Sequence, residues 1–108
     1  MPTHRDIDAR SLAMHQLVAE KIRRDPALLE RAKKTLARWR GMVCPASQPY
    51  LVEWERLLER GIEPCLAVAT ENSQRAAALR QSSPFAGLLT NQERFTFLRD
   101  WKRAHETP

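Results

Sequence analysis

Apolar residues recur at three- and four-residue intervals along most of this chain, the spacing that places side chains on one face of an α-helix. Asp8 can cap a first helix, because a carboxylate accepts the free N–H groups of a first turn. The pair Asp25-Pro26 predicts the start of a second helix, since proline at the first helical position loses no hydrogen bond. Gly41 is expected to end that helix, because glycine readily adopts a positive φ. The expected helices and their apolar faces are 8–24 (Ile7, Met14, Leu17, Val18, Ile22) and 26–40 (Leu28, Leu29, Ala32, Leu36, Trp39).

The second half of the chain continues this pattern in shorter segments. Two prolines interrupt residues 42–49, after which Ser47 is expected to cap a helix that ends at Gly61. Thr90 and Glu93 have the spacing of a capping box, in which each side chain accepts a hydrogen bond from the other residue's backbone N–H. The expected helices and their inward residues are 48–60 (Tyr50, Leu51, Trp54, Leu57, Leu58), 64–70 (Leu66, Val68), 72–80 (Ala76, Leu79) and 91–103 (Phe95, Leu98 and Trp101, with Phe97 beside them).

The chain shows no sustained alternation of apolar and polar residues, the pattern that would predict β-strands. It also shows no convincing internal repeat, and its 108 residues are the length of one small domain. The sequence therefore predicts an all-α fold, a compact bundle of five to six helices that forms a single domain over residues 1–108.

The net charge of +5 is unevenly distributed, and this narrows the choice of partners. Residues 1–40 and 72–108 are basic, whereas residues 41–71 are acidic, with Glu53, Glu55, Glu59 and Glu63 among them. A basic domain favours an acidic partner, which can be nucleic acid, an anionic lipid or an acidic protein surface. Charges of both signs suit a protein partner better than DNA, whose charge has one sign.

DNA binding through the first two helices is the main alternative. The junction at Asp25-Pro26 fits the tight turn of a helix-turn-helix, and basic residues of the second helix could contact phosphates. That helix begins with Ala27, Leu28, Leu29 and Glu30, however, and these residue types are poorly suited to contact bases. A solvated basic helix face is the favoured interpretation.

Composition argues against export, membrane insertion and redox chemistry. No apolar stretch approaches the roughly 20 residues that cross a bilayer, and no cationic-apolar leader opens the chain. Cys44 and Cys65 do not form a CxxC motif, which favours a reducing compartment. We therefore expect a cytoplasmic protein with no membrane partner.

Candidate catalytic residues are few. His4, His15 and His105 do not pair with other residues at metal-ligand spacing, and a glycine-rich phosphate loop is lacking. Glu55 and Glu59 share a helix face and could serve acid–base chemistry or hold a cation, but an acidic solvated face is the simpler explanation. We expect no enzymatic activity, no cofactor, no metal and no small-molecule substrate.

The most unusual stretch is the loop from Arg80 to Gly87, which combines turn-forming residues with a large apolar side chain. Phe85 either closes the end of the helical core or belongs to a shaped surface loop that meets a partner. The first interpretation is favoured for Phe85, whereas the two are evenly matched for Arg80, Ser82 and Ser83.

Three segments carry a resemblance to known proteins: SLAMHQLVAEKIRRDPALLERAKKTLARW, YLVEWERLL and RQSSPFAGLLTNQERFTFLRDW. Together they resemble a family of small helical bacterial antitoxins that are encoded beside toxins, in particular the antitoxin and chaperone partner of a zeta-toxin-like kinase effector of plant-pathogenic Xanthomonas. The likeness covers roughly residues 11–103, and RQSSPFAG followed by LTNQER is its most specific part.

The resemblance implies a non-catalytic protein that obstructs the nucleotide or substrate cleft of a P-loop kinase toxin. The chain is longer than the three-helix antitoxin of the zeta-type pair, so contact residues cannot be transferred one by one. A nucleic-acid-binding regulator, acting on its own operator, stays the alternative. The candidate partner-binding residues are Arg80, Gln81, Ser82, Ser83, Phe85, Glu55 and Glu59.

Overall fold

Six α-helices make up most of the computed structural model, which describes residues 4–42 and 45–105 and contains no strand within these ranges. The predicted all-α class is therefore confirmed. The helices are α1 (His4–Arg24), α2 (Leu28–Arg40), α3 (Gln48–Arg60), α4 (Ile62–Ala69), α5 (Gln74–Arg80) and α6 (Asn91–His105), with 3₁₀ turns η1 (Pro45–Ser47) and η2 (Ala86–Leu88).

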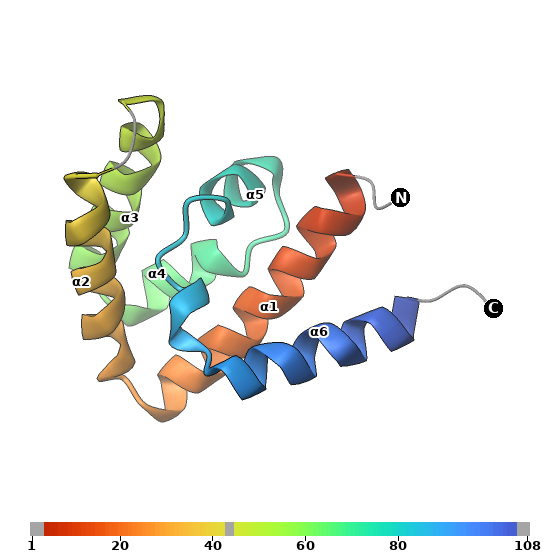
Figure 1. Cartoon of the computed structure of the whole chain (residues 1–108). Coiled ribbons are helices and arrows are strands. Elements are labelled where there is room, and N and C mark those ends of the chain that lie inside the picture. The colour runs from red at the N-terminus through yellow and green to blue at the C-terminus, as the bar shows by residue number, and fades with distance from the viewer. Residues whose placement is uncertain (1–3, 43–44, 106–108) are drawn as a thin grey trace.

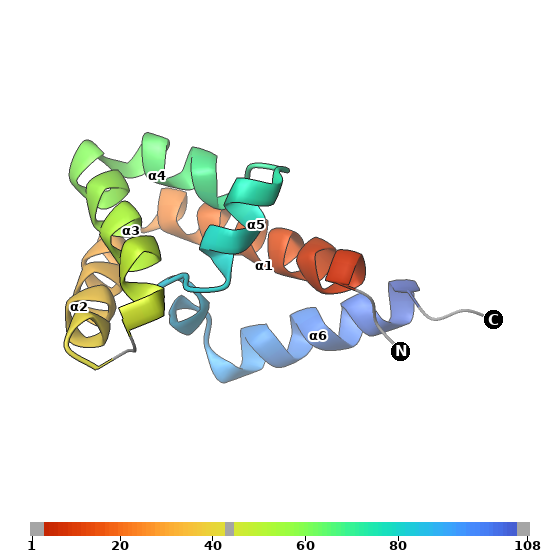
Figure 2. The same cartoon turned by 90° about the horizontal axis from the view of Figure 1, so that it is seen from above.

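Helices α1 to α5 surround the core, and α6 lies outside it. α2 and α3 form an antiparallel pair, and α4 and α5 return across α1 (Figure 1). The turn η2 contacts both α1 and α2, and from there α6 starts beside the C-terminal half of α1 and diverges from it (Figure 1). The view from above places the N-terminal end of α1 and the C-terminal end of α6 at the same end of the molecule (Figure 2).

Trp54 and Phe85 occupy the centre of the core. Both side chains are almost completely enclosed, and their rings meet edge to face with centroids 5.3 Å apart. The Trp54 indole Nε1 donates a hydrogen bond to the Leu79 carbonyl oxygen at 2.8 Å, so its polar atom is satisfied. Its burial confirms that Phe85 belongs to the core and not to an exposed surface loop, and the contacts of Trp54 join α3, α5 and the loop after α5.

Several helix ends differ from the sequence-based expectation. α1 begins at His4, so Asp8 lies inside the helix and does not cap it. α2 begins at Leu28, after a turn in which the Leu28 N–H donates to the Asp25 carbonyl at 3.1 Å. Gly41 ends α2 with a φ of −91°, so no positive φ is needed there. Ser47 lies at the start of α3 but makes no capping hydrogen bond with its side chain.

The helix ends in the second half of the chain follow the predictions more closely. Gly61 ends α3 with a φ of 118°, and α4 starts at once, two residues before Pro64. The Ser73 hydroxyl caps α5 by accepting from the Ala76 N–H at 3.1 Å. The predicted capping box of α6 is confirmed, and that helix continues to His105.

Three residues expected on the buried helix faces are exposed. Ile7, near the start of α1, exposes 43% of its surface. Tyr50 exposes 41% of its surface and Phe95 exposes 66%. Trp39 packs against the edge of the core and is half-buried. Trp101 is also half-buried. Cys44 lies outside the described residues.

Candidate interaction surface

Helix α6 contains no buried residue, although it carries three phenylalanine or tryptophan side chains. Phe97, Leu98 and Trp101 are half-buried, and α1 runs along one side of the helix (Figure 2). An amphipathic helix derives most of its stability from packing its apolar face, so an incompletely covered face is unusual. Contiguous apolar surface of this kind marks interaction sites on soluble proteins.

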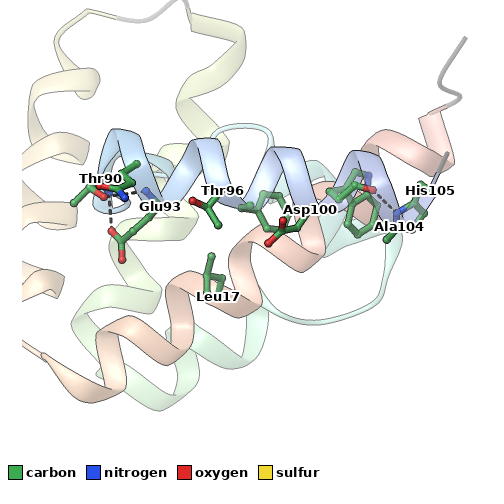
Figure 3. Close-up of a pocket in the computed structure, with 10 residues that line it drawn as sticks. Leu17, Thr90, Glu93, Thr96, Asp100, Ala104 and His105 are labelled. Carbon is green, nitrogen blue, oxygen red and sulfur yellow. Dashed lines mark hydrogen bonds between the residues drawn. The ribbon is translucent and has the colours of Figure 1, made fainter.

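The N-terminal turn of α6 is attached to α1 by Lys21. The Lys21 ammonium contacts the Glu93 Oε1 at 2.6 Å and donates to the Leu88 carbonyl at 2.8 Å. Glu93 Oε1 also accepts from the Thr90 N–H at 2.8 Å, while the Thr90 hydroxyl accepts from the Glu93 N–H at 3.1 Å (Figure 3). The hydrogen bonds from Lys21 and Thr90 lower the pKa of Glu93 to about 2.

An aromatic row follows α6 away from this attachment point. Phe97, Trp101 and His105 are spaced four residues apart, so they lie on one side of the helix. The rings of Phe97 and Trp101 stack with centroids 6.1 Å apart, and those of Trp101 and His105 at 3.8 Å. The His105 Nδ1 also forms a 2.9 Å hydrogen bond with the Trp101 carbonyl.

The aromatic row lines a groove of about 800 Å³ between α6 and α1 (Figure 3). Leu17 forms the α1 side, and Thr90, Gln92, Glu93, Thr96, Asp100 and Ala104 complete the lining. The described lining offers aromatic and apolar surface together with the carboxylates of Glu93 and Asp100, and it contains no cysteine or nucleophilic residue held by a histidine. We define these lining residues, together with Phe97, Trp101 and His105, as the α1/α6 groove.

His15 and Ser83 form a buried polar pair that fixes the loop after α5. The His15 Nδ1 lies 2.7 Å from the Ser11 carbonyl oxygen, which can only accept, so Nδ1 carries the proton. Burial lowers the pKa of His15, and nearby Arg80 lowers it further. The neutral ring therefore accepts from the Ser83 hydroxyl at 2.8 Å, and Ser83 in turn accepts from the Phe85 N–H at 3.1 Å.

Arg80 is a structural residue, because only 5% of its surface is exposed. Its Nη1 donates to the carbonyl oxygens of Glu71 at 2.7 Å and Ala69 at 3.3 Å, which ties α5 to the end of α4. Burial lowers the pKa of Arg80, while the negative charges of Asp8 and Glu71 oppose this shift. Its Nε has no hydrogen-bond partner among the described residues.

The candidate partner-binding residues therefore lie in different surroundings. Phe85, Ser83 and Arg80 are buried and hold the loop in place, whereas Gln81 is exposed and Ser82 is half-buried. Glu55 and Glu59 line a shallow groove with Lys33 of α2, to which the loop residues do not contribute. Arg40 forms an ion pair with Glu55 at 3.4 Å.

A second pocket, of about 760 Å³, lies between the start of α1 and the start of α5. Arg5 and Arg80 line it together with Asp8, Asn72 and Ser73, so charges of both signs meet there. The two arginines outnumber the single carboxylate of Asp8, so the formal charge of this lining is positive.

Features typical of catalysis are scarce in the described part of the chain. Burial raises the pKa of Cys65 to about 12, so this thiol is not a nucleophile at neutral pH. Within residues 4–42 and 45–105, no three His, Cys, Asp or Glu side chains cluster in a way that could hold a metal ion. None of the described helices is both long and apolar enough to cross a bilayer.

Sequence reasoning missed the α1/α6 groove, because it assigned Trp101 and its neighbours to the core. One signal was available: Phe97, Trp101 and His105 keep a four-residue spacing beyond the predicted helix end. Comparison of the chain with protein-family models, with curated proteins and with solved structures finds no match.

Proposed function

We propose that this chain is a non-catalytic antitoxin or chaperone that binds a cognate toxin and blocks its active cleft, the toxin being a zeta-like P-loop kinase. The α1/α6 groove is the observation that carries the binding part of the proposal, since its aromatic row is only half covered in the isolated chain. The resemblance over residues 11–103 supports the identity of the partner.

The chemistry of the groove favours a protein over a small molecule. Small-molecule sites combine an enclosed cavity with a few converging polar groups. Here the groove runs along a helix, and one of its carboxylates, Glu93, is already engaged by Lys21. Aromatic side chains such as Trp101 and Phe97 commonly supply the central contacts of protein interfaces.

DNA binding takes second place for two reasons. Leu28 and Leu29, at the start of α2, are buried, so the positions that would contact bases in a helix-turn-helix belong to the core. The basic residues Lys33 and Arg40 already form ion pairs with Glu30 and Glu55. A salt-dependent gel shift with operator DNA would support this alternative.

Co-expression tests the proposal directly. The neighbouring reading frame of the source genome is expressed in a bacterial host with or without this chain, and growth and co-purification are recorded. We expect the chain to restore growth and to elute with the neighbouring protein as a stable complex. Failure on both counts, or turnover of a metabolite by the purified chain alone, contradicts the proposal.

A further inference from the structure

The rim of the α1/α6 groove is basic on its α1 side. Arg10 and Arg24 lie seven residues before and after Leu17, two helical turns in each direction, so all three share one stripe of α1. Lys21 lies between Leu17 and Arg24 on the same stripe and is engaged by Glu93. Arg10 and Arg24 are exposed and form no ion pair within the described residues.

The α6 side of the rim is basic as well. Arg94 lies three residues before Phe97, and Arg103 lies three residues after Asp100, which places each beside a groove residue. Both arginines are exposed and lack an ion-pair partner in the part of the chain that the structure describes.

The acidic residues near the groove are mostly neutralised already. Glu93 is paired with Lys21 at 2.6 Å, and Asp100 with Arg99 at 3.3 Å. Asp6, on the Leu17 stripe, takes part in an interaction and adds one negative charge to the N-terminal end of that stripe. Glu20 is the acidic residue near this stripe without an ion pair in the described region, and basic side chains outnumber it. The unpaired charge around the groove is therefore positive.

We infer that the groove binds an amphipathic helix of a partner protein, whose apolar face contacts Phe97, Trp101 and Leu17 and whose flanking residues are acidic. Two helices that lie side by side present a seam that a third helix can fill, which is a common mode of peptide recognition. A second copy of this chain fits less well, because it would bring two basic rims together. This inference rests on the proposed function and specifies the partner segment.

Two synthetic probes test the charge preference. Each is a labelled peptide of roughly 18 residues, about five helical turns, with the same leucine and phenylalanine face. One carries glutamate at the flanking positions and the other carries lysine. Fluorescence anisotropy with the full chain should show at least about tenfold tighter binding of the glutamate peptide, with the preference shrinking in high salt.

Variants locate the binding site. Trp101→Ala should weaken binding of the glutamate peptide at least about tenfold, since aromatic anchors dominate such interfaces. Phe95→Ala is the matched control, because Phe95 lies on the same helix, is 66% exposed and does not line the groove. Neither residue is buried, so both variants should fold, and circular dichroism checks this.

Charge reversal separates the rim from the general basicity of the chain. Arg94→Glu combined with Arg103→Glu should abolish the preference for the glutamate peptide. Arg31→Glu combined with Lys34→Glu makes the same change in net charge on α2, away from the groove. This control variant should keep the preference for the glutamate peptide.

Several results would overturn the inference. These are equal or tighter binding of the lysine peptide, no binding of either peptide at the highest soluble concentration, and equal losses in Trp101→Ala and Phe95→Ala. A dimer in sedimentation that Trp101→Ala dissociates would assign the groove to a second copy. If Trp101→Ala still silences the toxin as the unaltered chain does, the proposed function stands and the groove assignment fails.

Discussion

His15 is buried in its neutral form, and its protonation state is coupled to folding. Its Nδ1 donates to the Ser11 carbonyl, its Nε2 accepts from Ser83, and positively charged Arg80 is close by. A proton on Nε2 would remove the acceptor for the Ser83 hydroxyl and place a second cation beside Arg80. Burial disfavours the charged ring most and Arg80 adds to this effect, whereas the hydrogen bond to Ser11 opposes it; the net result is a pKa of His15 below its ordinary value of 6.5.

Mild acid should destabilise the chain through His15. The unfolded chain takes up the proton near pH 6.5, whereas the folded chain does so only at lower pH, so the free energy of unfolding falls as the pH drops below about 6.5. Urea denaturation at pH 7.5 and 5.5 measures the loss. His15→Gln should shrink this pH dependence, and an unchanged difference in that variant would show that another group is responsible.

Phe85→Ala tests the interpretation that Phe85 closes the core. The side chain is 1% exposed and meets Trp54 edge to face, so its removal leaves a cavity that the neighbouring helices cannot fully close. We expect the free energy of unfolding to fall by about 3–5 kcal/mol in chemical denaturation, enough to unfold a marginally stable domain. A loss of about 1 kcal/mol or less would mean that the site is loosely packed.

At the scale of the element, α6 is the helix with the fewest tertiary constraints. Within the described residues, the side-chain hydrogen bond that joins it to another helix is the one between Glu93 and Lys21. The remaining local stabilisation comes from the capping box. Such an element is expected to open at a lower free-energy cost than the core.

Hydrogen exchange should reveal this difference. Amides of α6 should exchange faster than those of α1 around Val18 and Ile22, and Thr90→Ala should speed α6 further, because loss of a cap costs about 0.5–2 kcal/mol. Global unfolding in urea should change little. Equal protection of α1 and α6 would show that α6 is integrated into the core.

Acid should release α6 at much lower pH than it affects His15. The pKa of Glu93 is about 2, below its ordinary value of 4.5, so the contribution of this carboxylate is complete above about pH 4.5 and is lost as the pH falls toward 2. Glu93→Gln should remove this low-pH component from the α6 signal in a pH titration followed by circular dichroism. Persistence of the component in that variant would contradict the assignment.

Local signals in the sequence were sufficient to predict where α6 begins, but not which of its residues contact the rest of the molecule. The pattern of Thr90 and Glu93 predicted the start of the helix, because a capping box depends only on residues three positions apart. Spacing alone could not show that Phe95 faces solvent, since that depends on which face meets α1. The bond between His15 and Ser83 joins residues 68 positions apart and left no local trace.

At the scale of the whole molecule, the net charge says less about the charge of a favoured partner than the distribution of unpaired charges over the surface does. The chain carries +5 overall, yet pairs such as Arg40–Glu55 and Lys33–Glu30 neutralise part of the α2/α3 surface. Ion pairing in three dimensions therefore leaves a different pattern from the one along the sequence. The unpaired basic residues at the rim of the α1/α6 groove became visible only once Glu93 and Asp100 were assigned to their partners.

The attachment of α6 at one end also bears on the breadth of recognition. Lys21 secures the first turn, and the aromatic row lies progressively further from that anchor. Because α6 is fixed to α1 at its first turn, a small rotation of α6 about that turn changes the distance between α1 and Trp101 more than the distance between α1 and Glu93. If the groove binds a partner helix as we propose, such a rotation would let the same few side chains contact both bulky and slender helices, and divergent versions of one target would not each require a redesigned core.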